Sequence, residues 1–511
     1  MALSDFGLSS VVGIAASAGL FLSLVSLYTI SRLAYNNWFH PLAHIPGPIS
    51  ASASGLTYNL HMRNGTIIPW LMDLHKKYGD VVRVNPTEVS FISGDTAWQD
   101  IYGFRTGKNK TGAYLKDRSW FAKPVVKTYS LIVADEPTHS RMRRNLSHAF
   151  SDKALRDQEG IVQGFVDLLV HRLHEQVQNN VYAIDIMRWY NYTTFDIITD
   201  LTFGEPLYCL RDKDYHPWVN MVFASAKAIS LLVAKRNFPI FAYYDRIKGI
   251  FCPKPDAIKQ RKKFFELATQ KVTNRLERET MRPDFMSYVV KSQAIEAKAL
   301  TREEIDTNAV LFLVAGSETT ATMLSGTTYL LLKNPAVYAK LVHEIRSRFN
   351  TQSDITFDEV NKLDYMIACL QEGLRYYPPA PTGFPRVVPQ GGDTISGHYI
   401  PEGTSVYVSQ YAASHSESNW TDPEAYAPER WLGDKRYKDD KRTAINPFSF
   451  GPRNCLGKNL AYAEMRLILA KVLFNFDLEL VDKSADWIKQ QKVFVLWEKG
   501  SLMVKLNPVQ R

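Results

Sequence analysis

The feature of this sequence that most constrains its fold is a ten-residue loop around one cysteine. The loop runs from Phe448 to Gly457, reads Phe-Ser-Phe-Gly-Pro-Arg-Asn-Cys-Leu-Gly, and leads into an apolar helix predicted from Asn459 to Leu473. Backbone N–H groups and the positive end of that helix would stabilise a thiolate at Cys455. Because the thiolate is the form of cysteine that binds metals, the loop predicts an anionic metal ligand.

The other fixed residues of the loop suit a flat, bulky ligand. Gly451 and Gly457 allow positive φ and a close approach of the backbone, and Arg453 offers a cation for an acidic group on the ligand. Phe448 can cover the sulfur of Cys455 and exclude water. The alternative is a cysteine that only fills space, which is how most free cysteines behave.

The loop resembles the haem-binding loop of the cytochrome P450 family, Phe-x-x-Gly-x-Arg-x-Cys-x-Gly, with every fixed position present. The resemblance implies that Cys455 is the axial ligand of the iron in a haem b. It also implies the cytochrome P450 fold, a mainly α (α+β) triangular single domain with small β-sheets. This likeness covers essentially everything after the N-terminal segment, and the sequence is most similar to those of fungal microsomal members.

Composition is compatible with one large domain. The chain has 511 residues, 45% of them hydrophobic, and no linker rich in proline, glycine or serine divides it. Its four cysteines, Cys209, Cys252, Cys369 and Cys455, show no paired metal-ligand spacing and favour a reducing compartment. The net charge of +9 is spread through segments that also carry acidic residues, which argues against a nucleic-acid partner.

The N-terminus predicts a membrane anchor. No charged residue occurs from Phe6 to Ser31, and a helix of that length is about 39 Å long against a hydrocarbon core of about 30 Å. A cleaved signal peptide would need basic residues before the apolar run, where only Asp5 occurs, whereas Arg32 follows it. We therefore expect a single-pass protein of the endoplasmic reticulum membrane with a cytosolic body.

The prolines after the anchor indicate where the body begins. His40 to Pro48 reads His-Pro-Leu-Ala-His-Ile-Pro-Gly-Pro and cannot continue a helix. We predict an anchor over residues 1–33, a proline-rich hinge over 34–50 and a catalytic domain over 51–511. With a cytosolic body, the five Asn-x-Ser/Thr sequons would be chance matches.

Periodicity predicts a body dominated by helices. Residues Asp80 to Ser93 alternate as a hairpin, whereas Ile161 to Gln178 and Pro255 to Glu279 are long amphipathic helices. Short β-rich pieces return at Thr394 to Gln410 and at Val493 to Leu506.

A polar motif interrupts an apolar helix predicted from Asp306 to Lys333. Residues Ala315 to Thr320 read Ala-Gly-Ser-Glu-Thr-Thr, and such groups are costly in an apolar helix unless they have partners. A capping box or a hydroxyl bonded to the preceding turn is the structural alternative. The motif also resembles the family pattern Ala-Gly-x-Asp/Glu-Thr-Thr.

That second resemblance implies catalytic roles. Gly316 would let the helix widen and dioxygen fit, Thr319 would hydrogen-bond the oxygen being activated and a water, and Glu318 would link that water to bulk protons.

Two further groups of residues are expected around the haem. Glu372 and Arg375 lie at i and i+3 of one helix, and the resemblance implies that Arg430 joins them as a structural cluster. Haem propionates need cations, and the candidates are His139, Arg143, Arg386 and Arg453.

The resemblance implies that electrons come from NADPH through an external NADPH–cytochrome P450 reductase, with cytochrome b5 as a second donor. The chain has no flavin- or nicotinamide-binding fingerprint. The basic residues expected on the docking face are Arg141, Arg144, Lys435, Arg436, Lys438, Lys441, Arg442 and Lys458. A solvated charged face is the simpler alternative.

The family layout places a lipophilic substrate against four largely apolar stretches. The resemblance to fungal members with similar sequences implies a terpenoid or a polyketide as the substrate. These stretches are Tyr114 to Phe121, Phe312 with Ala315, Pro381 to Phe384, and Val495 to Trp497. The resulting hypothesis is a monooxygenase that hydroxylates or epoxidises a secondary metabolite. Two alternatives are a haem-thiolate isomerase or dehydratase that needs neither O2 nor NADPH, and a non-catalytic haem sensor or scaffold.

Overall fold

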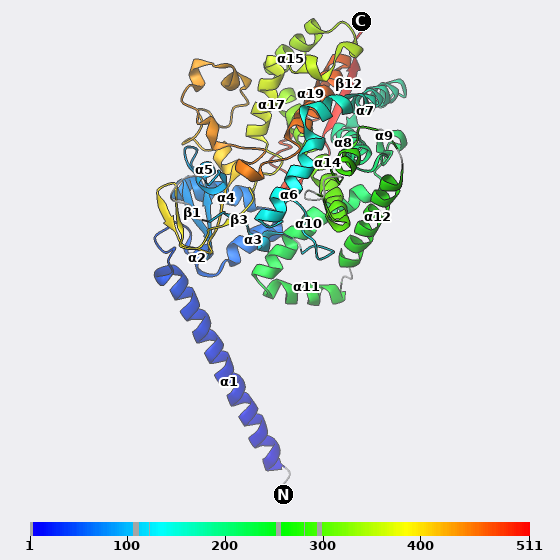
Figure 1. Ribbon diagram of the computed structural model, residues 1–511. Helices are drawn as coiled ribbons and strands as arrows, with labels where there is room; N and C mark the ends of the chain where they lie inside the picture. Colours follow the sequence, from blue (N-terminus) through cyan, green and yellow to red (C-terminus); the bar gives the residue numbers. More distant parts are fainter. Residues whose placement is uncertain are drawn as a thin grey trace.

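The computed structural model describes residues 4–105, 112–121, 123–251, 257–278, 280, 282–293 and 299–510. A long helix, α1 (Ser4–Ala34), projects from one end of the body, and the C-terminus lies at the opposite end (Figure 1). A π-helical turn (Tyr35–Phe39) extends α1 towards the proline-rich segment.

The body is built mainly from helices. The longer ones are α4 (Ile67–Tyr78), α6 (Glu136–Leu146), α7 (Asp152–Gln178), α8 (Ile186–Phe203), α10 (Pro217–Asn237), α11 (Ile240–Phe251), α12 (Ala257–Glu277), α14 (Arg302–Lys333), α15 (Pro335–Arg348), α17 (Asp364–Tyr376) and α19 (Lys458–Asn475). The shorter ones are α2 (Ile49–Ser54), α3 (Leu56–Asn64), α5 (Ala97–Tyr102), α9 (Cys209–Asp212), α13 (Phe285–Gln293), α16 (Phe357–Val360) and α18 (Gln410–Ser414).

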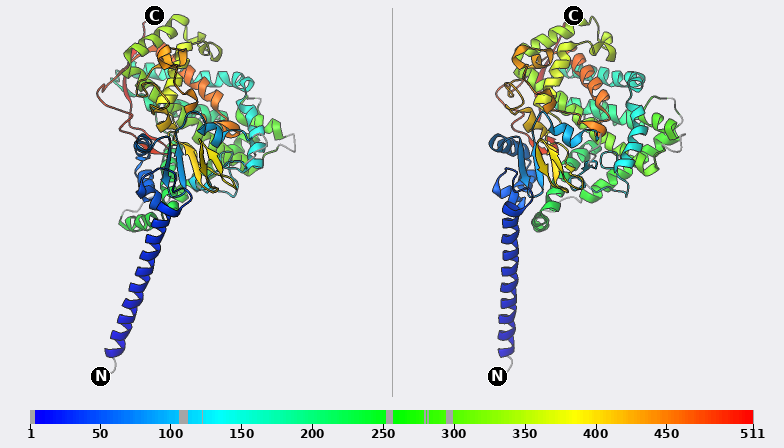
Figure 2. Two further views of the ribbon diagram at one scale, coloured as in Figure 1. Left: turned by 90° about the vertical axis from the view of Figure 1, so that its left-hand side faces the viewer. Right: turned by 60° about the vertical axis from the view of Figure 1, so that its left-hand side comes forward.

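Small sheets lie mostly at the end of the body from which α1 projects (Figure 2). The largest has the order β1-β2-β8-β5-β3, and two-stranded (β6-β7, β10-β11) and three-stranded (β4-β12-β9) sheets accompany it. The strands are β1 (Val81–Asn85), β2 (Glu88–Phe91), β3 (Leu115–Lys116), β4 (Ile184–Asp185), β5 (Arg386–Val387), β6 (Asp393–Ile395), β7 (His398–Ile400), β8 (Ser405–Val408), β9 (Phe476–Leu480), β10 (Lys492–Phe494), β11 (Leu496–Glu498) and β12 (Met503–Pro508). The antiparallel pair β1 and β2 confirms the predicted hairpin.

Helix α14 runs through the core and positions the site. It packs against α8, α17 and α19, and it begins four residues before the predicted start because Thr301 and Glu304 form a capping box. Buried residues occur on nearly all faces of α14, which is typical of a central helix in a protein core. A mainly α body with small sheets confirms the predicted fold class.

Among the described residues, three helices are long and apolar enough to cross a membrane. Two of them, α10 and α14, pack within the body, whereas the segment Gly13–Phe39 is exposed along its apolar window. The N-terminal helix is therefore the one compatible with a membrane anchor.

Candidate functional site

The cysteine loop is held by one glycine of unusual conformation. Gly451 has φ +73°, and a Cβ atom there would collide with the carbonyl oxygen of Tyr102 on α5. Gly457 has φ −85°, and a Cβ atom there would make only an ordinary contact with Phe150, so this position does not use the positive φ that glycine allows. Only Gly451 uses the conformational freedom predicted for both.

The Cys455 thiol lies among groups that shift its pKa in opposite directions. Burial raises the pKa of Cys455, whereas the Gly457 N–H, Arg143 and Lys458 act in the opposite direction. The side chain keeps accessible surface. The other described cysteines, Cys209 and Cys369, are free and buried, and Cys252 lies outside the described residues.

Basic side chains converge above this loop. His139 is buried. Desolvation, together with four neighbouring cations, lowers the pKa of His139 to about 3. They are Arg453, Arg143, Arg386 and Lys116. Such a concentration of positive charge inside a protein is costly without an anion.

Most of this charge is not neutralised by the protein. Arg453 pairs with Glu136 at 2.9 Å and donates to the Ala134 carbonyl, while Arg143 donates to Asn454. Among the described residues, His139 Nδ1 and Arg386 Nε are buried without a hydrogen-bond partner. The cluster therefore fits a ligand with more than one anionic group, as the two propionates of a haem require.

Lys116 is a member of this cluster that the sequence did not reveal. It lies on β3, which pairs with β5 and so brings Lys116 opposite Arg386, and it is only 8% exposed. Burial, Arg386 and Arg453 hold the pKa of Lys116 well below its usual range. The sequence did not indicate Lys116 because it lies in the stretch Tyr114 to Phe121, which was interpreted as largely apolar and substrate-lining.

Helix α14 presents one accessible stripe inside the body. The stripe contains Leu311, Ala315 and Thr319, which are spaced by four residues and keep accessible surface. Val314 and Gly316 beside them are also partly accessible, whereas Ser317 and Glu318 are buried. The Thr319 hydroxyl donates to the Ala315 carbonyl at 2.7 Å, which is the hydroxyl-to-preceding-turn bond considered as an alternative. Phe312 packs against Phe150 and Phe285, and its place in the substrate site stays a prediction.

Gly316 permits close helix packing. The helix is continuous from Arg302 to Lys333, so the structure contains no widened turn at Gly316. A Cβ atom at Gly316 would lie 2.6 Å from Ile198 Cδ1 on α8. Ile198 therefore occupies the space that a side chain at Gly316 would need. This corrects the expectation of a locally opened helix.

Glu318 is closed off from solvent. It is buried and forms an ion pair with Lys499, which follows β11, and Lys499 also donates to Thr322 at 2.7 Å. Glu318 is therefore not itself exposed to bulk water, and its role in linking a bound water to bulk protons stays a prediction. Lys499 was missed because nothing in the sequence near either residue signals a contact across the fold.

A second buried carboxyl group lies behind the motif. Glu464 on α19 bonds the Thr320 hydroxyl, and burial raises the pKa of Glu464 to about 8. A raised carboxyl pKa means that the folded state holds a proton that the unfolded state releases. The resulting stability is complete below pH ~4.5 and is lost as pH rises through about 8.

We therefore expect Glu464→Gln to stabilise the protein at alkaline pH, because the amide keeps the bond to Thr320 without ionising. The gain in unfolding free energy should be ~3 kcal/mol at pH ~8 and should vanish near pH ~5. Chemical unfolding across this pH range measures it. Parallel pH profiles for the two proteins would contradict the prediction.

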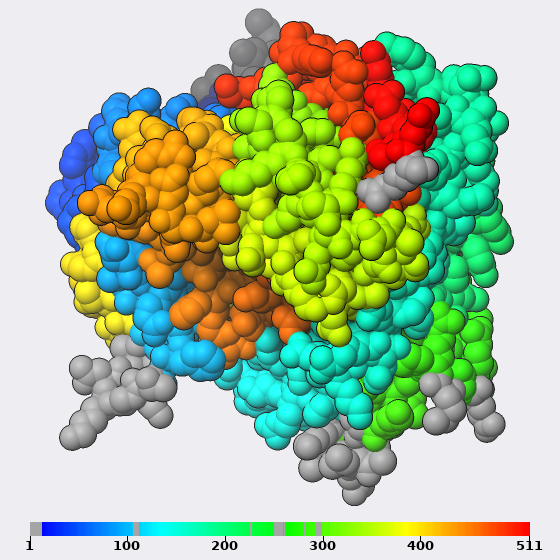
Figure 3. All heavy atoms as spheres, turned by 90° about the horizontal axis from the view of Figure 1, so that it is seen from above, coloured from blue at the N-terminus to red at the C-terminus, as the bar shows by residue number. Residues whose placement is uncertain are grey.

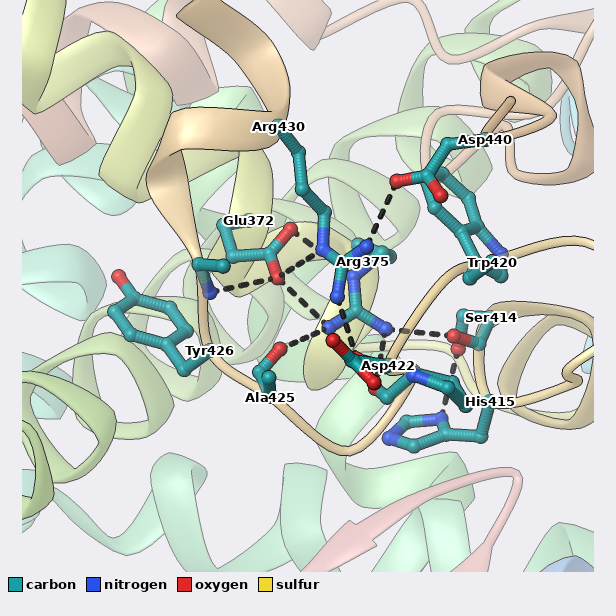
Figure 4. A network of polar contacts seen from close by, with 12 residues as sticks. Glu372, Arg375, Ser414, His415, Trp420, Asp422, Ala425, Tyr426, Arg430 and Asp440 are labelled. Atoms are coloured by element: carbon teal, nitrogen blue, oxygen red, sulfur yellow. Dashed lines mark hydrogen bonds and ion pairs between the residues drawn. The ribbon is translucent and has the colours of Figure 1, made fainter. Parts of the chain in front are cut away.

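The structure brings together Glu372, Arg375 and Arg430 in a buried network (Figure 4). Arg375 holds Glu372 through two bonds of 2.8 and 3.0 Å, and Arg430 donates to Glu372 at 3.2 Å. Arg430 also pairs with Asp440 at 2.7 Å, a partner that the sequence did not indicate. Both oxygens of Glu372 are bonded, with the Trp431 indole completing the set.

The other apolar stretches are partly buried. Trp497 stacks on Tyr377 at 4.7 Å and donates to the Pro378 carbonyl, whereas Val495 and Leu496 keep accessible surface. Substrate contacts in this region stay a prediction.

The basic face is smaller than expected. Arg141 pairs with Glu304, Arg436 with Asp434 and Lys441 with Asp95. Arg144, Lys435, Lys438, Arg442 and Lys458 are exposed and have no ion pair within the described part of the chain. Seen from above, the orange segments before α19 lie between the cyan region around α6 and the yellow-green region of α15 and α17 (Figure 3).

Comparison with known proteins agrees with this arrangement. The family model described as cytochrome P450 matches residues 46–506. The chain is 51% identical to the cytochrome P450 monooxygenase lcsI of Purpureocillium lilacinum over 98% of this chain and 96% of that protein. It is 47% identical to the monooxygenase traB of Penicillium crustosum over the whole of both chains. It is also 43% identical to the monooxygenase efuB of Hormonema carpetanum over 100% and 99% of the two chains.

Proposed function

The chain belongs to the cytochrome P450 family and is a monooxygenase, and on that premise we propose that it inserts one oxygen atom into a lipophilic secondary metabolite, a terpenoid or a polyketide. The cysteine loop around Cys455, beside a buried cluster of cations that lacks enough anions, is the observation that carries the proposal. The relatives' names weigh against the isomerase alternative.

The residues present fit a haem. Cys455 would ligate the iron, and the buried cluster of His139, Arg143, Arg386 and Arg453, extended by Lys116, would hold the propionates. When bound, a haem with a thiolate ligand supplies O–O cleavage and transfer of one oxygen atom to the substrate.

The chain's own residues would control protons and water. Thr319 offers a hydroxyl on the accessible stripe that can hold a water, and Glu318, the preceding residue of the helix, can accept and release a proton. Ala315 on the same stripe adds apolar surface against which a substrate can lie.

We expect Thr319→Ala to keep the haem spectrum while most electrons from NADPH are diverted into hydrogen peroxide. The ratio of product to NADPH consumed should fall about tenfold because the water that relays protons loses its hydroxyl partner. Ser325→Ala, which removes a buried hydroxyl from the same helix, is the matched control. Full coupling in Thr319→Ala would remove Thr319 from this role.

Labelled dioxygen tests the monooxygenase reaction directly. The chain is expressed with an NADPH–cytochrome P450 reductase in a host that supplies precursor metabolites, and products are analysed by mass spectrometry. One labelled oxygen atom should enter each product. A product formed without NADPH, or without the label, would favour the isomerase alternative.

The partner is proposed to be an acidic reductase, with cytochrome b5 as a second donor. Arg144, Lys435, Lys438 and Lys458 offer exposed positive charge that can steer an acidic protein. Association should then weaken with rising salt.

We propose that α1 anchors the protein in the endoplasmic reticulum membrane with the body in the cytosol, and that the anchor, hinge and catalytic domain occupy 1–33, 34–50 and 51–511. Helix α11 lies at the same end of the body as α1 (Figure 2). It exposes large apolar side chains at Ile240, Tyr243, Tyr244 and Ile247. Their spacing forms one helical face that suits the membrane surface beside the anchor.

Deleting residues 1–33 should convert an integral membrane protein into one that alkaline washing releases from membranes. The loss of an apolar helix long enough to span a bilayer is the reason. Fractionation with immunodetection measures it. Retention of the truncated chain after washing would contradict the role of α1.

Treatment with a glycosidase tests the orientation. Asn145, Asn191 and Asn419 are buried, Asn64 is exposed, and Asn109 lies outside the described residues. With a cytosolic body, even the exposed sequon stays unmodified. A shift in mobility would place the body in the lumen.

A further inference from the structure

The two oxygen atoms of the Glu318 carboxylate have different environments. Its Oε1 atom forms the ion pair with Lys499 and accepts a 3.3 Å bond from the Thr322 hydroxyl. Its Oε2 atom is buried and has no hydrogen-bond partner among the described residues. Glu372, which is also a buried carboxylate paired with a cation, has both oxygens bonded. A purely structural pair is expected to resemble Glu372, whereas Glu318 keeps one oxygen able to accept a proton.

Lys499 reaches Glu318 from a distant part of the chain. It lies between β11 and β12, and its side chain is 3% exposed. Tyr377, which follows α17, is also close: burial and the Glu318 carboxylate raise the Tyr377 pKa, and its hydroxyl donates to Gln491 at 2.5 Å. Lys499 is therefore the cation that balances Glu318 from the elements packed around it, while Glu464 contacts the neighbouring Thr320.

We propose that Lys499 is a positioning residue that keeps Glu318 ionised and fixed, so that Oε2 can accept a proton and pass it on during turnover. This rests on the proposed catalytic role of Glu318. Each proton accepted at Oε2 is released again, so the carboxylate returns to its ionised state and nothing else is consumed. Without the cation, an ionised carboxylate in this position would be buried and unpaired.

The test compares the full-length chain with Lys499→Met, Lys499→Arg, Glu318→Gln and the double variant Lys499→Met/Glu318→Gln. Lys227→Met, which removes the exposed ion pair of the adjacent Glu498, is the matched control. For each protein the ratio of product to hydrogen peroxide, its solvent isotope effect and its pH dependence are measured with a reductase. Lys499→Met should lower the ratio about tenfold and raise the isotope effect, and Lys499→Arg should stay within about twofold of the parent.

Two results would overturn the proposal. One is unchanged coupling in Lys499→Met, and the other is a loss in the double variant equal to the sum of the single losses. Non-additive losses, with the double variant no worse than Glu318→Gln, support it. A structural role alone predicts no change in the isotope effect of folded, haem-containing protein.

A second readout does not depend on turnover. Equilibrium unfolding should show that Lys499→Met lowers the unfolding midpoint more at pH ~8 than at pH ~5, since only an ionised carboxylate is costly to leave unpaired. Adding Glu318→Gln should remove this pH dependence. Should Lys499→Met not fold, the double variant, which removes both charges, still folds if the pair is the cause, and its failure to fold would count against the proposal. A parent protein that lacks the haem-thiolate spectrum would instead refute the proposed function, leaving the unfolding result to judge the ion pair.

Discussion

Replacing Cys455 with alanine is expected to abolish both the carbon monoxide difference spectrum of a haem thiolate and all product formation. Neither of the other described cysteines could substitute, because Cys209 and Cys369 are buried elsewhere in the core, where burial raises the pKa of each thiol. The loss should be complete and not graded, since an iron without its thiolate ligand lacks the electron donation that favours O–O cleavage.

Matched controls separate ligation from packing. Cys209→Ala and Cys369→Ala each remove a buried sulfur and should cost about 1 kcal/mol of stability without changing the spectrum. A Cys455→Ala protein that retains the thiolate spectrum would refute the ligand assignment. The same spectrum in all three alanine variants would point to a ligand outside the described cysteines.

Glu372→Gln is expected to destabilise the folded protein by about 3–5 kcal/mol and to cause loss of haem. The change leaves Arg375 and Arg430 buried with Asp440 as the remaining carboxylate of the network. Because Arg430 lies in the segment that precedes the cysteine loop, the loop should lose its support when the network opens. Chemical unfolding and haem retention during purification measure the two effects.

An exposed pair provides the control for this prediction. Glu359 pairs with Arg348 at 2.8 Å, and both side chains are partly exposed to solvent. Glu359→Gln should change the stability very little because water already screens the pair. Equal costs at Glu359 and Glu372 would mean that burial does not control the strength of these pairs.

Local sequence determined the elements that carry the chemistry. The hairpin, the long helices and the positions of the cysteine loop and of the α14 motif follow from periodicity, capping residues and fixed motif spacing, all of which act within one segment. Glu372 with Arg375 was also predictable, since residues three apart on a helix are neighbours.

Contacts between segments distant in the chain could not be predicted in this way. Lys116 joins the propionate cluster because β3 pairs with β5, and Asp440 meets Arg430 through a loop without regular structure. The expected widening at Gly316 was wrong because Ile198 of α8 fills that space. The sequence of α14 does not indicate which residue of another helix packs against it.

By itself, the sequence determined that Cys455 lies in a loop suited to a haem and that an acid and an alcohol follow one another on an apolar helix. Only the tertiary structure decided what surrounds them. Burial raises the Cys455 pKa more than the loop lowers it, and Lys499, brought in from beyond β11, closes Glu318 off from solvent. Desolvation and ion pairing depend on every atom packed around a group, and that packing is set by the whole fold.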